Sequence, residues 1–291
     1  MILTHCLPWT EWSREERTAR MRELAELGET HIVLTSDLLQ EAAFEPDYLI
    51  TFAREMESFG LTFTDSHALW GIWSDLGIPL PEWKEILLLR HRMALRFCQR
   101  YGVTTMTFHV GTTFNSIYGK DLKLEDYRRA LTSSLDILLP EAEKCGVVIA
   151  LENQWTPLNH SSVLLPIMEE YRSPHLGLCY DSGHGNLTEK GMSFPDKSCD
   201  PSVWKEFGEP VKWEENLAEK FSPWIVNCHL HDNNGMRDKH KLPGEGTVDW
   251  DRILKVLRGS PRLQCIQNES IPGENTIPHV CRVFRELLRD F

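Results

Sequence analysis

The feature that most constrains this chain is the regular alternation of short apolar segments with longer amphipathic ones. Eight short segments rich in β-branched and other apolar residues predict strands, at 1–7, 30–35, 61–67, 103–109, 147–152, 175–181, 224–231 and 263–269. Helices are expected between and after them, at 13–27, 46–59, 81–101, 124–145, 161–171, 211–221, 250–257 and 274–290. A strand followed by a helix, repeated without exception, indicates a parallel sheet.

Eight such units in 291 residues predict an α/β fold, a single-domain (β/α)₈ TIM barrel over 1–291. Gly28, Gly60, Gly102 and Gly146 fit left-handed caps that end a helix and lead into the next strand. A doubly wound open sheet is the competing fold. The units are evenly spaced, however, and no G-x-G-x-x-G follows the first strand. The barrel is therefore favoured, with a loop insertion at about 182–210.

Composition and charge narrow the function classes. The net charge of −12 argues against nucleic acid or an anionic membrane as the main partner. No apolar run reaches the roughly 20 residues of a membrane span, and the N-terminal segment lacks the pattern of a signal peptide. The eight cysteines contain no C-x-x-C pair, which is typical of reduced thiols. A cytoplasmic protein is expected.

Ionisable residues end most of the predicted strands. In a barrel the carboxyl ends of the strands carry the chemistry, and burying several ionisable groups there requires mutual pairing or a cation. Imidazoles and carboxylates are also the groups that bind divalent metals. The residues at these ends are His5, His67, His109, Glu152, Asp181, His229 with His231, and Glu269.

Each of these residues has a structural alternative when it is considered alone. A histidine at a strand end is more often a hydrogen-bonded structural residue than a ligand, and His160 and His175 are assigned no further role. The segment 232–235 would form an ordinary turn and Gly244-Glu245-Gly246 a loop bend. Trp70 and Trp155 could be packing residues or an apolar wall for a substrate. Only the joint occurrence of acids and histidines at successive strand ends favours a metal site.

Several motifs in the C-terminal half carry a family resemblance. They are ALEN at 150–153, CYDSGH at 179–184, HLHD at 229–232, DKH at 238–240, GEG at 244–246 and Glu269. In order and spacing they resemble the xylose isomerase-like TIM barrel superfamily, the sugar phosphate isomerase and epimerase group. This superfamily also contains inosose dehydratases and, more distantly, endonuclease IV. The motifs are specific to the superfamily and separate its members poorly.

The resemblance implies a divalent-metal-dependent sugar isomerase or epimerase that transfers protons next to a carbonyl through an enediolate. One ion, with Mn²⁺, Mg²⁺ or Co²⁺ favoured and Zn²⁺ compatible, would be held by Glu152, Asp181, His229 and Glu269. Glu152 and Glu269 would be the catalytic proton acceptor and donor. The substrate, a sugar or polyol, would contact His67, His109, His184, His231, Trp70, Trp155 and Arg237.

Other reactions stay open at this point. A lyase or dehydratase similar to inosose dehydratase would use the same residues. An abasic-site nuclease resembling endonuclease IV would hold three zinc ions with His67, His109, His184, Asp238 and His240 as additional ligands. The sequence lacks a Gly-rich phosphate cradle at a helix N-terminus, so an unphosphorylated substrate is favoured. Relatives in this superfamily often form dimers or tetramers, so a homo-oligomer is compatible with the resemblance.

Overall fold

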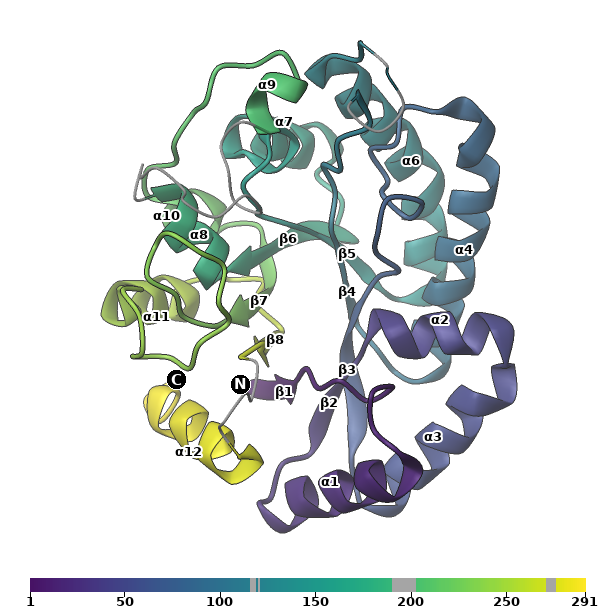
Figure 1. The fold of residues 1–291 in the computed structure, drawn as a ribbon, viewed down its shortest axis with the longest axis vertical. Helices are drawn as coiled ribbons and strands as arrows, with labels where there is room; N and C mark the ends of the chain where they lie inside the picture. The colour runs from purple at the N-terminus through teal and green to yellow at the C-terminus, as the bar shows by residue number, and fades with distance from the viewer. Residues whose placement is uncertain (116–118, 120, 190–202, 271–275) are drawn as a thin grey trace.

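Eight parallel strands form a closed barrel in sequence order, with β1 hydrogen-bonded to β8, and helices surround it (Figure 1). The computed structural model describes residues 1–115, 119, 121–189, 203–270 and 276–291. The single-domain (β/α)₈ prediction is confirmed. The strands are β1 Ile2–His5, β2 His31–Leu34, β3 Thr62–His67, β4 Thr105–Phe108, β5 Val148–Glu152, β6 Leu176–Asp181, β7 Ile225–Leu230 and β8 Cys265–Asn268.

Most helices occupy their predicted positions. They are α1 Arg14–Glu26, α2 Ser36–Phe44, α3 Pro46–Ser58, α4 Pro81–Arg100, α6 Leu124–Cys145, α7 Ser161–Tyr171, α8 Ser182–Glu189, α9 Val203–Glu206, α10 Leu217–Phe221, α11 Trp250–Arg258 and α12 Ile277–Leu287. Local sequence accounts for several ends. Ser13 and Glu16 form a capping box at α1, and Gly146 ends α6 with a φ of 71°.

Three helices differ from the expectation, and α10 begins at Leu217 instead of about 211. Helix α9 lies at Val203–Glu206, within the segment expected to be irregular. Helix α2 was not predicted, although Thr35 caps it by accepting a hydrogen bond from the Leu38 amide. Helix α8 begins directly after β6, where an irregular insertion was expected at about 182–210. Residues 190–202 of that insertion lie outside the described residues.

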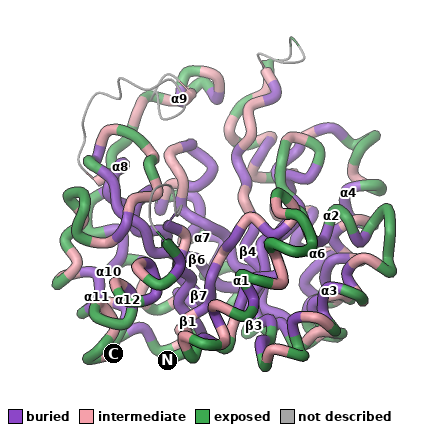
Figure 2. Tube along the Cα trace, turned by 60° about the horizontal axis from the view of Figure 1, so that its bottom comes forward, coloured by how far each residue is buried: buried purple, intermediate pink, exposed green. Residues whose placement is uncertain are grey.

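The strand register decides which side chains enter the barrel. Asp181 pairs with His229 on the neighbouring strand, and Glu152 pairs with Cys179. Because side chains alternate along a strand, Val148 and Ala150 share the face of Glu152, and they form a small buried cluster with Cys179 and Val226. Most other apolar residues form one large core, and the strands are buried almost throughout (Figure 2). Within the described part of the chain, no helix has the length and apolar character needed to cross a membrane.

Candidate metal and substrate site

Four ionisable side chains converge where the last four strands end. Glu152 ends β5, Asp181 ends β6, His229 lies in β7 and Glu269 follows β8. Their ligand atoms all lie within 4.8 Å of one another. Glu152, Asp181 and His229 have no solvent-exposed surface. We call these four residues the carboxylate cluster, and it is the metal-ligand set implied by the sequence motifs.

Histidines compensate the charge of the two glutamates. His229 Nδ1 lies 3.0 Å from Glu152 Oε1 and 3.3 Å from Glu269 Oε2. Each glutamate has a second histidine as well. His109 pairs with Glu152, and His67 Nε2 lies 3.2 Å from Glu269 Oε1. Burial alone would raise the pKa of both carboxyl groups, but these histidines outweigh it and hold both pKa values well below the usual range.

The carboxylate cluster fits a divalent cation. Glu152 Oε2 and Glu269 Oε2 are buried and accept no hydrogen bond among the described residues. Both oxygens face histidines as ion pairs, Glu152 Oε2 with His109 and Glu269 Oε2 with His229 Nδ1 at 3.3 Å. Neither contact has the geometry of a hydrogen bond, so a bound ion would have no hydrogen bond to these two oxygens to break. Three carboxylates with one imidazole suit Mn²⁺, Mg²⁺ or Co²⁺, and Zn²⁺ also accepts such donors.

A second group of metal-ligand side chains lies beside the first. His184, His231, Asp238 and His240 place their ligand atoms within 4.8 Å of one another, and we call them the histidine cluster. Asp238 Oδ2 lies 3.3 Å from His184 Nε2 and 3.2 Å from His240 Nε2. The rings of His231 and His240 stack with centroids 3.9 Å apart. His231 also contacts the first cluster, because its Nε2 lies 3.0 Å from Asp181 Oδ2.

Backbone carbonyls orient two of these histidines. His184 Nδ1 is 2.9 Å from the Asn153 carbonyl, and His240 Nδ1 is 2.8 Å from the Glu269 carbonyl. A carbonyl can only accept, so Nδ1 donates in both rings and Nε2 faces the centre of the cluster. This is the usual arrangement of metal-binding histidines. Asp238 Oδ1 accepts no hydrogen bond among the described residues although it is buried, so this cluster also fits a cation.

Without a cation the histidine cluster holds protons. Burial lowers the pKa of His240, but Asp238, Glu269 and Asp181 outweigh it and raise that pKa to about 9. The pKa of His184 is raised well above its usual value against the same effect of burial, chiefly by Asp181 and Asp238. The pKa of Asp238 is lowered, since the neighbouring histidines overcome its own burial. Cation binding at this cluster therefore has to displace protons.

Asp232 positions the loop that carries Asp238 and His240, a role that the sequence analysis missed by treating 232–235 as an ordinary turn. Its carboxylate is buried and accepts four hydrogen bonds, from the amides of Asn233, Gly244 and Val248 and from Trp250 Nε1, at 2.8–3.1 Å. An antiparallel bridge between Asp232 and Lys241 closes the loop. The signal in the sequence was its place, because Asp232 directly follows the two histidines at the end of β7.

Two glycines permit the close contacts around this loop. A Cβ atom at Gly183 would lie 1.9 Å from the His231 ring, and one at Gly246 would lie 2.1 Å from the Asn233 carbonyl oxygen. Neither distance is physically tolerable, so both positions require glycine for steric reasons. The expected bend at 244–246 is present, with a φ of 92° at Gly244. His240 itself has a φ of 43°, a conformation that non-glycine residues rarely adopt outside functional or strained sites.

A cleft of about 890 Å³ opens onto both clusters at the carboxyl ends of the strands. His67, His109, His184, Trp70 and Trp155 line it, and their contacts with a substrate stay predictions. His231 is fully buried behind it. The described residues that line the cleft include neither lysine nor arginine. Arg237, expected to hold the sugar, is exposed and does not line the cleft in this structure.

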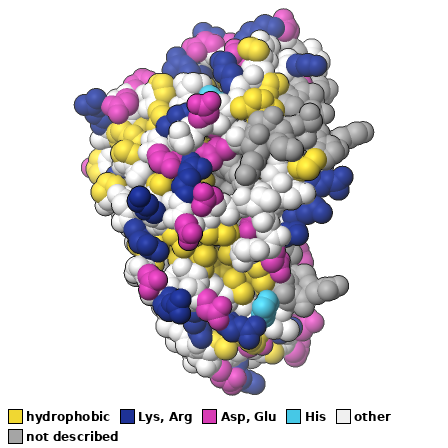
Figure 3. Space-filling view, turned by 90° about the vertical axis from the view of Figure 1, so that its left-hand side faces the viewer, with side chains coloured by type: hydrophobic (Ala, Val, Ile, Leu, Met, Phe, Trp, Pro, Cys, Tyr) yellow, Lys and Arg dark blue, Asp and Glu magenta, His cyan; other side chains and the backbone are white. Residues whose placement is uncertain are grey.

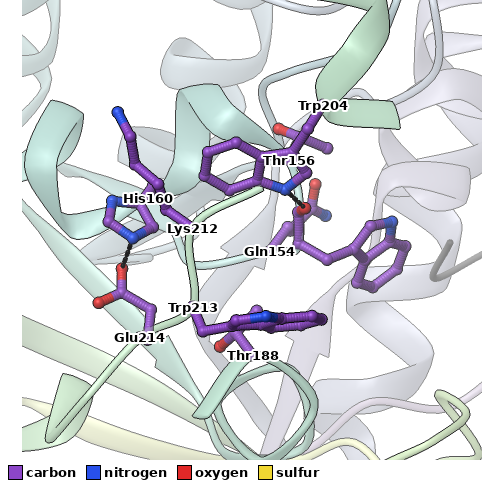
Figure 4. A pocket seen from close by; sticks show the side chains of 9 residues that line it. Gln154, Thr156, His160, Thr188, Trp204, Lys212, Trp213 and Glu214 are labelled. Carbon is purple, nitrogen blue, oxygen red and sulfur yellow. Dashed lines mark hydrogen bonds and ion pairs between the residues drawn. The ribbon is translucent and has the colours of Figure 1, made fainter. Parts of the chain in front are cut away.

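A smaller pocket, drawn in Figure 4, shares Gln154 and Trp155 with the lining of the cleft. Trp204 and Trp213 wall it, and the Trp204 indole nitrogen donates to the Trp155 carbonyl at 3.0 Å. At its other end the buried Glu214 carboxylate lies 3.4 Å from His160 (Figure 4) and accepts hydrogen bonds from Ser161. These contacts give His160 the structural role expected for it.

His5 is the strand-end residue that does not join the site. Its Nε2 lies 3.1 Å from Glu29 Oε2, and Glu29 in turn binds Arg285 of α12. His5 therefore contacts the region between the barrel and α12. His175 lies at the other end of its strand and is 2.9 Å from the Val147 carbonyl, in agreement with a structural role.

Comparison with known proteins identifies relatives over nearly the whole chain. Residues 21–287 match the family described as "Xylose isomerase-like TIM barrel". A curated relative, the uncharacterized protein y4fM of Sinorhizobium fredii, is 27% identical over 175 residues, which is 58% of this chain and 47% of the relative. The chain thus spans about half the length of the curated relatives that it matches.

Solved structures share the fold at low sequence identity. A D-tagatose 3-epimerase-like protein superposes with a TM-score of 0.72 at 18% identity, covering 99% of this chain and 97% of the other. The 3-keto-D-glucoside 4-epimerase YcjR from E. coli gives 0.71 at 17% identity, covering 99% of each chain. The IOLI protein, solved with a bound zinc atom, gives 0.68 at 15% identity, covering 100% and 99%. At these identities the likeness shows the fold alone.

Proposed function

The chain belongs to the xylose isomerase-like TIM barrel family, and from that premise we propose that it is a divalent-metal-dependent sugar isomerase or epimerase. The observation that carries the proposal is the pairing of two glutamates within one cluster at the floor of the cleft. Glu152 and Glu269 lie on β5 and after β8, and each has its own histidine partner. Two carboxylates with separate proton partners can remove a proton and return another one.

The proposed reaction moves a proton next to a carbonyl. One glutamate takes the proton from the carbon beside the carbonyl, which gives an enediolate, and the other returns a proton. His109 next to Glu152 and His67 next to Glu269 can each exchange a proton with their glutamate through the contacts described above. Glu152, Asp181, His229 and Glu269 would hold the ion. A divalent ion, when bound, polarises a carbonyl and stabilises developing negative charge.

The other residues of the cleft would bind and orient the sugar. His184 belongs to the histidine cluster, and its Nδ1 also lies 3.6 Å from Asp181 Oδ1 of the carboxylate cluster, so its imidazole is placed to contact a substrate oxygen. Trp70 and Trp155 offer apolar ring faces, which suit the C–H faces of a sugar. Because cationic side chains are missing from the described lining, a neutral sugar or polyol fits better than a phosphorylated one. The cysteines in the described residues are all free, which supports a reducing, cytoplasmic location.

The test is deuterium exchange in D₂O with candidate ketoses, inososes and 3-keto sugars. Protein of measured metal content should incorporate deuterium at the carbon next to the carbonyl and yield the epimer or isomer. A dehydratase would instead release water and give an unsaturated or deoxy keto product, so product analysis separates the two reactions. Absence of both exchange and product with all three substrate classes, in metal-loaded protein, would show that the proposal is wrong.

A nuclease is the second candidate, and the histidine cluster is the observation that favours it. Together with His67 and His109, whose rings are neighbours, the two clusters offer ligands for more than one ion. The acidic cleft opposes this reading, since DNA is a polyanion. Acidic and basic side chains are also interspersed on the face over α8, α10 and α11 (Figure 3). Incision of an abasic duplex by metal-loaded protein, together with three bound zinc ions, would support the nuclease. One Mn²⁺ or Mg²⁺ per chain and no incision would remove it.

A further inference from the structure

The cleft is larger than one sugar needs. A hexose has about 12 non-hydrogen atoms, and even at the roughly 30 Å³ that a water occupies in the liquid it would fill about 360 Å³. The cleft measures about 890 Å³, near the upper end of the range for pockets that enclose drug-sized ligands. With a sugar at the carboxylate cluster, more than half of this volume remains.

The remaining volume lies on the opposite side of the cleft, over the loops that follow β1, β2 and β3. Leu7 and Pro8 come from the first loop, and Trp70 and Ile72 from the third. Trp70 leaves 64% of its surface exposed although it lines the cleft, and its ring lies 6.5 Å from that of His109. A large aromatic group exposed next to the site is a surface to which another ring can stack. We call these four residues the apolar wall.

The charges beside the apolar wall select an uncharged ligand. Glu11 after β1 and Asp37 at the start of α2 line this end of the cleft, and both are exposed. Cationic side chains are missing here among the described residues that line the cleft. A phosphate or carboxylate there would meet like charge, and the described lining residues offer no lysine or arginine to compensate it. Hydroxyl groups, in contrast, can donate hydrogen bonds to carboxylates and to Thr35.

We propose that the substrate is an uncharged glycoside, with its reacting sugar at the carboxylate cluster and a second ring stacked on the apolar wall. This inference rests on the proposed function and deepens it by naming the substrate class. The second ring can be another sugar or an aromatic aglycone, because both present a flat face without charge to Trp70. A free monosaccharide would leave the wall in contact with water and would bind more weakly.

The experiment compares equilibrium binding of four unreactive probes to the metal-loaded protein by calorimetry. The probes are methyl glucoside, phenyl glucoside, a glucose disaccharide and its derivative phosphorylated on the second ring. We expect phenyl glucoside or the disaccharide to bind about tenfold tighter than methyl glucoside, the increment that a well-placed ring contact provides. The phosphorylated derivative should lose that gain. Whether phenyl glucoside or the disaccharide binds more tightly decides between an aromatic aglycone and a second sugar.

A matched pair of variants assigns the gain to the wall. Trp70→Ala should weaken binding of phenyl glucoside or the disaccharide more than binding of methyl glucoside, and so reduce the tenfold difference to about threefold or less. Trp73→Ala is the control, because Trp73 lies on the same loop, is 39% exposed, contacts the Trp83 ring at 4.3 Å between centroids and does not line the cleft. Equal affinity for all neutral probes, or an equal loss for all of them in Trp70→Ala, would overturn the inference.

Turnover separates this inference from the proposed function. If free monosaccharides are epimerised as efficiently as glycosides, the function stands and the glycoside inference fails. If glycosides bind with a gain that depends on Trp70 but neither keto-glycosides nor free keto sugars exchange deuterium, the function fails and the binding inference stands.

Discussion

The carboxylate cluster and the histidine cluster use similar side chains but are built differently. The first has three carboxylates and one imidazole, all within or directly after strands of the barrel. The second has three imidazoles and one carboxylate. Its Asp238 and His240 lie on the loop after β7, and its His184 lies in α8. His231 contacts Asp181, so the two clusters are neighbours in one cleft.

The difference shows that the two clusters depend on different parts of the fold. The register of parallel strands places Asp181 beside His229, so forming the barrel is enough to assemble the first cluster. The second also needs the four hydrogen bonds to Asp232 and the two glycines that allow close contact. Local changes in the loop should therefore affect the histidine cluster and leave the carboxylate cluster in place.

The largest effect is expected from the two glutamates. Glu152→Gln and Glu269→Gln each remove a group that can accept a proton, and each should lower turnover by about 10²- to 10⁴-fold. Steady-state rates on an identified substrate provide the measurement. Glu245→Gln, the same chemical change at an exposed loop position, is the control and should keep the wild-type rate. Full turnover in either cluster variant would contradict the proton-transfer roles.

A smaller and more local effect is expected from Asp238→Asn. The variant removes the only carboxylate of the histidine cluster, and even outer partners of metal ligands cost about 10- to 100-fold in affinity when they are replaced. We therefore expect at least this loss for a cation bound there. Metal content after dialysis should fall by one ion per chain if both clusters are occupied in the wild type.

The control for this change is Asp251→Asn on the exposed side of α11. It should leave the metal content unchanged. If Asp238→Asn also emptied the carboxylate cluster, the two clusters would form one linked site, and the comparison drawn above would be wrong.

Asp232→Asn tests the support of the loop. An amide would turn its NH₂ group toward backbone N–H donors, so at least one buried donor would lose its acceptor. The expected cost is about 1–3 kcal/mol of unfolding free energy, together with weaker cation binding at the histidine cluster alone. Chemical denaturation and metal titration measure the two effects. Asn234→Ala, at an exposed position in the same turn, should change stability by about 0.5 kcal/mol or less.

The smallest effect is expected on the pH dependence of thermal stability. As the pH rises, the metal-free protein should lose stability, and the metal should bind more tightly. The raised pKa of His240, about 9 against the model-compound value of 6.5, stabilises the metal-free protein fully below about pH 6.5. This stabilisation should be lost as the pH rises towards 9. Cation binding displaces protons, so metal affinity at the histidine cluster should rise over the same interval. Thermal midpoints with and without metal check both trends, and parallel trends would count against a cation at His240.

The sequence by itself determined the barrel and the members of the carboxylate cluster. Alternating strands and helices leave few topologies, and in a barrel the ends of successive strands must meet. Strand-end positions grouped Glu152, Asp181, His229 and Glu269 with the other strand-end histidines, and the family resemblance then singled out these four as the metal-ligand set. The same reasoning placed His67 and His109 in the cleft, where the structure pairs them with the two glutamates.

Only the tertiary structure decided where the remaining polar residues point. His5 ends a strand like His67 does, yet it faces Glu29 and α12, because a shift of one residue turns a side chain to the other face of a strand. Asp232 looked like a turn residue until its four donors, up to 18 positions away, were placed around it. Strand periodicity can be read along the chain, but loop contacts depend on how the chain returns to itself. The first cluster is therefore visible in the sequence. For the second, the resemblance offered His184, Asp238 and His240 as additional ligands, and only the fold showed that His231 joins them in one cluster.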